Sequence, residues 1–131
     1  MIFLKSALAS ALFVAALFAV TPTWAESLTG PQENAVRSAK EYLSIQGFSR
    51  RDLIQQLSSS AGSGYTLADA TVAVDSLHID WEKEAVRSAK NYLSIQGFSC
   101  RGLIQQLSSS AGSGYTVSQA TYGAQQAGAC E

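Results

Sequence analysis

The segment AVRSAKEYLSIQGFSRRDLIQQLSSSAGSGYT, residues 35–66, occurs a second time in this 131-residue chain as AVRSAKNYLSIQGFSCRGLIQQLSSSAGSGYT, residues 85–116. The offset between the two copies is 50 residues, and the likeness continues to Thr71 and Thr121 before the copies diverge. An internal repeat predicts two structural units of the same fold that contact each other. Because duplication alone explains the identical positions, identity between the copies is not evidence of function.

The apolar residues at the start of each copy recur with the period of an α-helix. In the first copy this stripe consists of Ala35, Val36, Ala39, Tyr42 and Leu43. Pro31 suits the first turn of the helix, where a missing N–H is tolerated. Gly47 is expected to end the helix in a left-handed conformation.

Two further helices follow in each copy. Ser49 is an expected N-cap, with Asp52 three residues later. Thr66 with Asp69, and Thr116 with Gln119, predict capping boxes at the starts of the third helices. Residues 58–64 have no apolar period and contain two glycines, which predicts a loop. No stretch shows the alternation of a strand, so the chain is predicted to be all-α. We expect two tandem three-helix units, residues 32–80 and 81–131, with helix-turn-helix-like packing.

The first 25 residues have the pattern of a secretory signal peptide. Lys5 supplies the charged region, residues 7–20 the apolar region, and Thr23-Trp24-Ala25 an A-x-A-like cleavage site. The alternative is a membrane anchor that is never cleaved. In both cases the rest of the chain is exported, to the periplasm or the cell surface, and it touches the membrane only through residues 1–25.

The balance of charges argues against nucleic acid as a partner. The chain has 9 basic and 10 acidic residues, a net charge of −1, and removal of Lys5 with the signal peptide would make it −2. Phosphate binding needs clustered, uncompensated Lys and Arg. Arg37 and Lys40, repeated at Arg87 and Lys90, form a small basic stripe that is typical of a solvated helix face.

The chain shows no constellation of catalytic or metal-binding residues. Its one histidine, His78, falls between the two units, and neither Asp75 nor Asp80 has an acidic counterpart in the second copy. Three such ligands on a helix end and a linker are a weak metal signal. We therefore expect a protein that is not an enzyme, that carries no cofactor and no metal, and that acts by binding another protein.

Cys100 and Cys130 are the only cysteines. Export favours a disulfide between them over metal binding. Their equivalents in the first copy are Arg50 and Asp80, which predicts an ion pair in the same place. The alternative is that Asp80 caps the helix that begins at Trp81. Trp81 has no aromatic counterpart in the first copy and is expected to act as a wedge between the units.

Tyr65 and Tyr115 follow the glycine-rich loops of the two copies. Tyrosine gives rigid amphipathic contact area, and an adjacent loop leaves the backbone free to adapt to a partner. The two tyrosines are therefore the candidate partner-binding residues, and packing into the core is the alternative.

Four motifs occur in the same order in both copies, namely SAK-x-YL, GFS-x-x-(G/D)-LI-x-QL, GYT and A-T-x-(A/G). On these motifs the sequence resembles the tandem repeat of Ltp-type host cell surface-exposed lipoproteins. The resemblance implies paired helical units outside the membrane and superinfection exclusion, in which an exported protein blocks the entry of phage DNA. It also implies a protein partner, the phage tail tape measure protein. The chain departs from the family in having no cysteine near Ala25 that could carry a lipid.

A second hypothesis for the function does not use the resemblance. An exported helical protein of this size could be an envelope-associated module that binds cell-wall polymer or another envelope protein. Both hypotheses require exposed helical faces, so the sequence alone does not separate them.

Overall fold

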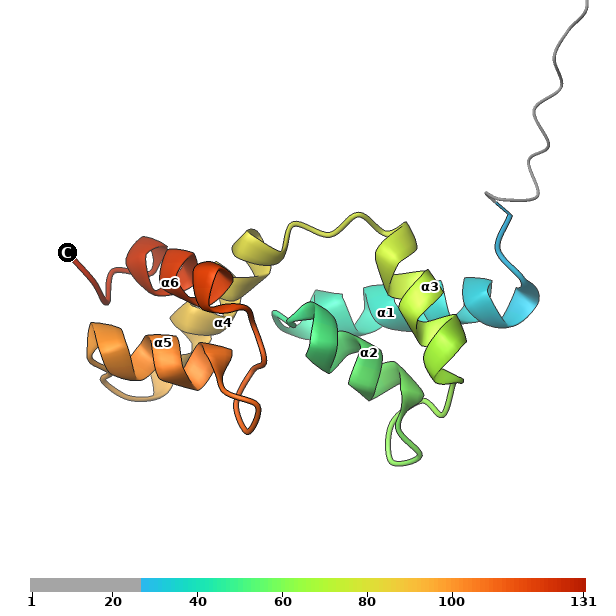
Figure 1. The fold of residues 1–131 in the computed structure, drawn as a ribbon, viewed down its shortest axis with the longest axis horizontal. Coiled ribbons are helices and arrows are strands. Elements are labelled where there is room, and N and C mark those ends of the chain that lie inside the picture. The colour runs from blue at the N-terminus through green and yellow to red at the C-terminus, as the bar shows by residue number, and fades with distance from the viewer. Residues whose placement is uncertain (1–26) are drawn as a thin grey trace, which may run out of the picture.

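The computed structural model describes residues 27–131, which form six α-helices and no strand (Figure 1). The helices are α1 (Gly30–Ile45), α2 (Arg50–Ser58), α3 (Leu67–Ser76), α4 (Trp81–Ile95), α5 (Cys100–Ser108) and α6 (Val117–Gln126). Helices α1–α3 form one unit and α4–α6 the other, so the predicted all-α fold of two three-helix units is confirmed. The predicted signal peptide, residues 1–25, lies outside the described residues. No described helix has the length and apolar character needed to cross a bilayer.

Each unit has its own hydrophobic core. Leu53 and Leu57 of α2 are fully buried in the first unit, and Leu103 and Leu107 of α5 are fully buried in the second. Alanines supply most of the remaining core surface, and they allow the first and third helices of each unit to approach closely. Because helices this short are marginal alone in water, burial of these side chains provides most of their stability.

Side-chain caps define where the helices begin. Ser49, Thr66 and Thr116 each accept the backbone N–H three residues later, so the predicted N-caps are confirmed. At Thr116 a returning side-chain bond completes a capping box. The predicted capping box at Thr66 is wrong, because the Asp69 carboxylate makes no returning bond to Thr66. It accepts from the Gln32 side-chain amide at 3.3 Å instead, which ties α3 to the start of α1.

The predicted disulfide between Cys100 and Cys130 is confirmed, and it joins the first residue of α5 to the C-terminal tail. The predicted ion pair between Arg50 and Asp80 is wrong. Arg50 instead makes a bidentate pair with Asp75 in the last turn of α3, with nitrogen–oxygen distances of 2.8 and 2.9 Å. The Asp80 carboxylate is already used as the N-cap of α4, which was the alternative role.

Trp81 connects the two units, as expected. It is the first residue of α4, yet its side chain packs against the core of the first unit, together with Leu77 and Ile79 of the linker. Between these residues, His78 has a positive φ of 48°, a left-handed conformation that turns the chain after α3. The linker is thus packed against the first unit.

Replacing both Cys100 and Cys130 by serine should lower the free energy of unfolding by about 3–4 kcal/mol, because the bond closes a loop with a sequence separation of 30 residues. Urea denaturation followed by circular dichroism measures this loss. The control is Asp75→Asn, which removes the ion pair of the first unit. Both partners of that pair are about half exposed, so the control should lose no more than about 1 kcal/mol. Equal losses in the two variants would contradict the prediction.

The contribution of the Asp75 ion pair should also depend on pH. The hydrogen bonds from Arg50 are the main cause that lowers the pKa of Asp75 in the folded protein. This contribution is therefore fully present above the pKa of the unfolded state, about 3.9, and is lost as the pH falls through the lower folded-state pKa. The stabilities of the parent and of Asp75→Asn should differ at neutral pH and converge in acid. A gap that stays constant across that range would disprove the linkage.

Candidate functional site

The two units meet head to tail. The inner turn, residues 46–49 between α1 and α2, lies against α4 of the second unit. The outer turn, residues 96–99 between α4 and α5, lies at the opposite end of the second unit (Figure 1). The interface contains Glu84, whose side chain is only 11% exposed. Charged side chains are rarely buried unless they are paired, so we take this interface as the candidate functional site.

Glu84 and Arg87 of α4 bind two backbone groups of the first unit. The Glu84 carboxylate accepts the N–H of Phe48 at 3.2 Å, and it also accepts from Arg87 at 3.0 and 3.1 Å. Arg87 in turn donates to the Leu43 carbonyl at 2.8 Å, in the last turn of α1, where no helical N–H is available to that oxygen. We call these four groups the α4 clasp. Arg87 is exposed, as predicted for the basic stripe, but its guanidinium also bonds to a backbone group of the first unit.

Gly47 allows α4 to come close to the inner turn. A Cβ at this position would lie 2.8 Å from the backbone oxygen of Glu84 and 2.8 Å from Ser88 Oγ, which is too close for a side chain. The predicted left-handed conformation of Gly47 is wrong, because α1 ends with Gln46 as an extended C-cap. Among the described residues, the glycines with positive φ are Gly64, Gly114 and Gly128. Gly47 is thus required by the interface and not by the helix end.

Arg51 makes a second contact between the units. Its guanidinium donates to the backbone carbonyls of Ser110 and Gly112, at 3.1 and 3.4 Å, and pairs with the neighbouring Asp52 at 2.8 Å. It also covers Gly114, where a Cβ would clash with the guanidinium. The first unit therefore holds the glycine-rich loop of the second.

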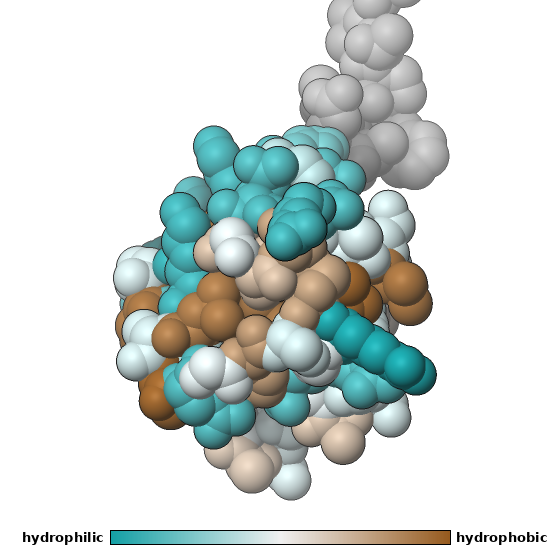
Figure 2. Space-filling model, turned by 90° about the vertical axis from the view of Figure 1, so that its left-hand side faces the viewer, coloured by the Kyte–Doolittle hydropathy of each residue, from teal (hydrophilic) through white to brown (hydrophobic). Residues whose placement is uncertain are grey.

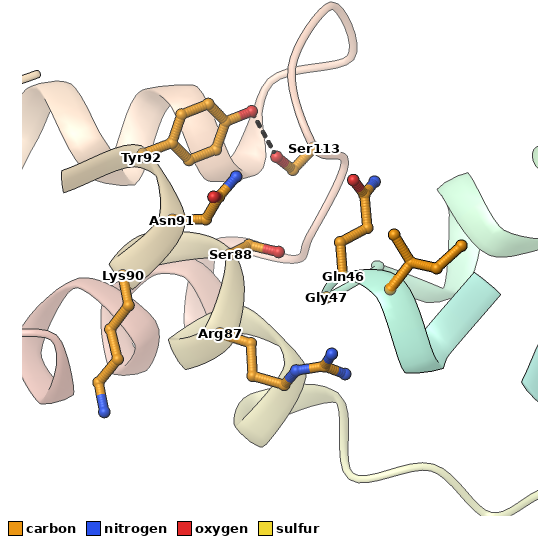
Figure 3. A pocket seen from close by; sticks show the side chains of 9 residues that line it. Gln46, Gly47, Arg87, Ser88, Lys90, Asn91, Tyr92 and Ser113 are labelled. Carbon is orange, nitrogen blue, oxygen red and sulfur yellow. Dashed lines mark hydrogen bonds between the residues drawn. The ribbon is translucent and has the colours of Figure 1, made fainter. Parts of the chain in front are cut away.

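An open cleft of about 380 Å³ lies beside the α4 clasp (Figure 3). Its lining residues are Ile45, Gln46, Gly47, Arg87, Ser88, Lys90, Asn91, Tyr92 and Ser113. Figure 3 shows Gln46 of the first unit opposite α4, and the Tyr92 hydroxyl bonded to Ser113 at 2.9 Å. The described residues of this lining include no carboxylate, histidine or cysteine, and residues 27–131 contain no group of three such side chains placed to hold a metal. The cleft offers hydrogen-bonding groups for binding, without an acid–base pair.

The two candidate tyrosines differ in how deeply they are buried. Tyr115 is 3% exposed and its hydroxyl lies 2.7 Å from Ser88 Oγ, so the prediction that it meets a partner is wrong. Burial raises the pKa of Tyr115 well above its usual range, and the charge of Asp52 in the first unit adds to the rise. Tyr65 is half-buried against the first core, with its hydroxyl 3.0 Å from Ser38 Oγ, and it stays an untested candidate.

Sequence analysis did not find the α4 clasp. One signal was present, because position 84 is Glu whereas the equivalent position 34 is Asn, directly before the identical AVRSAK blocks. The carboxylate of this copy makes a contact that the Asn34 of the other copy does not make. The spacing within α4 does not reveal which backbone groups Glu84 and Arg87 bind, because the Phe48 N–H lies 36 residues from Glu84 and the Leu43 carbonyl lies 44 residues from Arg87.

The comparisons with known proteins agree with this architecture. The sequence model of the host cell surface-exposed lipoprotein family matches the chain twice, at residues 31–77 and 80–126, which together are more than half of the chain. Among solved structures, the chain is similar to Ltp, a superinfection exclusion protein from the Streptococcus thermophilus temperate phage TP-J34. The TM-score is 0.68 at 27% sequence identity, and the match covers 76% of this chain and 97% of that chain. A comparison with curated proteins found no match.

Glu84→Ala should lower the free energy of unfolding by about 1–3 kcal/mol, because it leaves the Phe48 N–H without its acceptor and Arg87 without a counter-charge. The matched control is Asn34→Ala, at the equivalent exposed position of the first unit, which should change stability by less than about 0.5 kcal/mol. Denaturant unfolding of both variants is the measurement. If the two substitutions had the same effect, the clasp would not hold the units together.

Proposed function

The chain belongs to the host cell surface-exposed lipoprotein family, and from this premise we propose that it acts in superinfection exclusion. The observation that carries the proposal is the similarity to the superinfection exclusion protein of phage TP-J34, which extends over 97% of that chain and over both units of this one. In this proposal the protein is exported, lies at the cell surface, and blocks the entry of DNA from an incoming phage.

The geometry supports binding as the mode of action. The α4 clasp, Arg51 and Trp81 fix one unit against the other, so the pair presents preformed surfaces. A rigid surface loses less conformational entropy when a partner binds than a mobile one does. The polar cleft and the exposed helical faces offer backbone and side-chain groups to a protein partner, and we propose that the protein works without catalysis.

The partner we propose is a phage tail protein, namely the tail tape measure protein that the family resemblance implies. Contact with it outside the membrane would stop the step in which phage DNA crosses. The N-terminal segment, residues 1–25, would either remain as the attachment to the membrane or be removed after export.

Expression in a susceptible bacterium, followed by phage challenge, tests the proposal. We expect cells that make the full chain to adsorb phage normally and to block DNA entry, with the two steps scored separately. A variant that lacks residues 1–25 should give no protection, because it would stay inside the cell. Unhindered infection by every phage tested, together with retention of the protein on purified cell wall, would overturn the proposal in favour of a module that binds envelope polymer.

A further inference from the structure

The head-to-tail arrangement leaves one copy of a binding surface unused. The inner turn is covered by α4, whereas the outer turn, which has the same sequence Gln-Gly-Phe-Ser, faces away from the first unit (Figure 1). In an open pair of units, a heterologous contact of this kind leaves each of its two surfaces unpaired on one unit. The end of the molecule that carries the outer turn faces the viewer in Figure 2, where a band of apolar surface crosses largely polar surroundings.

A comparison of the inner turn with the outer turn, which has the same sequence, shows what the contact with α4 covers. Ser49 of the inner turn is 1% exposed, whereas its equivalent Ser99 in the outer turn is exposed. A Cβ on Gly47 would meet the backbone of α4 at 2.8 Å, whereas a Cβ on Gly97 would meet nothing within 4 Å. Because the local sequences are the same, these differences arise from the presence or absence of a helix packed on the turn.

The second unit has counterparts of the two backbone groups that Glu84 and Arg87 bind in the first unit. The Phe98 N–H corresponds to the Phe48 N–H that donates to Glu84, and the Leu93 carbonyl corresponds to the acceptor of Arg87. Within residues 27–131, neither the Phe98 N–H nor the Leu93 carbonyl has a hydrogen-bond partner. Both groups are therefore available to a helix with the side chains of α4.

Arg101 adds a positive charge to the same end of the molecule. Its equivalent Arg51 is paired with Asp52, but the residue after Arg101 is Gly102. Among the described residues no carboxylate lies within ion-pair distance of Arg101, which is exposed. The outer turn thus favours an occupant that is more acidic than the one on the inner turn.

The outer turn is also fixed in shape before any partner arrives. Ser99 caps α5 by accepting the N–H of Gly102 at 2.9 Å, and the next residue, Cys100, is bonded to Cys130 of the C-terminal tail. Phe98 packs edge to face on Tyr92, with ring centroids 5.8 Å apart. A surface held in this way loses little entropy on binding.

We propose that the outer turn, with Leu93 and Arg101, is the docking site for a helix of a partner protein that carries Glu and Arg three residues apart, followed by a small residue. The carboxylate accepts from the Phe98 N–H, the guanidinium donates to the Leu93 carbonyl, and the small residue faces Gly97. The assignment of this helix to a phage protein rests on the proposed function, whereas the chemistry of the site does not.

A second copy of this chain is a poor occupant. The helix that it could offer is α1, which has Asn34 where α4 has Glu84. The Asn34 side chain accepts a hydrogen bond from Arg37, so neither residue presents the charged pair of the clasp. Pro31 also stands where α4 has Trp81. The residues of α1 therefore favour a foreign helix at the outer turn.

Binding of a synthetic helix to the full exported chain tests the proposal directly. The probe is a peptide with the sequence of residues 82–95, cross-linked to keep it helical, because a peptide of this length is a marginal helix in water. In NMR spectra of labelled protein it should cause saturable shifts of the Phe98 and Gly97 amides and leave the Phe48 amide unchanged. A peptide with Gln at the position of Glu84 should bind about tenfold more weakly, through loss of the charged acceptor.

Gly97→Ala is the matching change in the protein. It should leave the unfolding midpoint unchanged, weaken peptide binding by at least about tenfold, and restore phage DNA entry in cells. Gly47→Ala, at the occupied turn, should instead lower the unfolding midpoint, because its Cβ meets the α4 backbone.

The outcomes separate the docking site from the proposed function. Absence of shifts at the outer turn, normal peptide binding by Gly97→Ala, or concentration-dependent self-association through this turn would each overturn the docking proposal. Peptide binding that Gly97→Ala abolishes supports the docking site even if the parent protein fails to exclude phage. In that case the proposed function alone is wrong.

Discussion

The hydrogen bond from the Phe48 N–H to the Glu84 carboxylate is the constraint on which the arrangement of the two units depends. It closes a network in which Arg87 neutralises the buried carboxylate and satisfies the Leu43 carbonyl at the end of α1. A buried charge is tolerated only when it is paired and hydrogen-bonded in this way. The Leu43 carbonyl lies in the last turn of α1 and the Phe48 N–H lies in the inner turn that follows. The clasp therefore fixes how the first unit sits on the second.

Two nearly identical sequences thus acquire different surfaces. At position 84 a carboxylate replaces the amide of position 34, and this carboxylate is the acceptor with which α4 binds the inner turn. The unit that contributes α4 keeps its own turn, residues 96–99, free. The free binding surface is therefore the outer turn of the second unit, as in other tandem repeats whose terminal units lack a neighbour on one side.

Features encoded within a few residues could be predicted from the sequence, because they depend on local chemistry. The N-caps at Ser49, Thr66 and Thr116 and the six helices belong to this class. The disulfide was predicted on another ground, because the chain contains only two cysteines. Features that depend on contacts between the two units could not be predicted from the sequence. Tyr115 is buried, whereas its equivalent Tyr65 is only half-buried. The prediction for Gly47 failed for a local reason, because α1 ends with Gln46 in an extended conformation, and α4 ends in the same way at Gln96 where no helix covers the turn. The Arg50–Asp80 pair failed for a local reason, since Asp80 caps the next helix by accepting the Lys83 N–H.

The covalent bond in the second unit and the ion pair in the first follow from this asymmetry. Arg50 and Asp75 join α2 to α3 in a unit that is further held by Trp81, Arg51 and the clasp, so a pair of exposed charges is sufficient there. In the second unit, the segment after α6 has no helix to hold it, and such segments readily fray. The Cys100–Cys130 bond holds that tail against the start of α5, directly after the unpaired turn. The disulfide therefore supplies at the open end the rigidity that the neighbouring unit supplies at the inner turn.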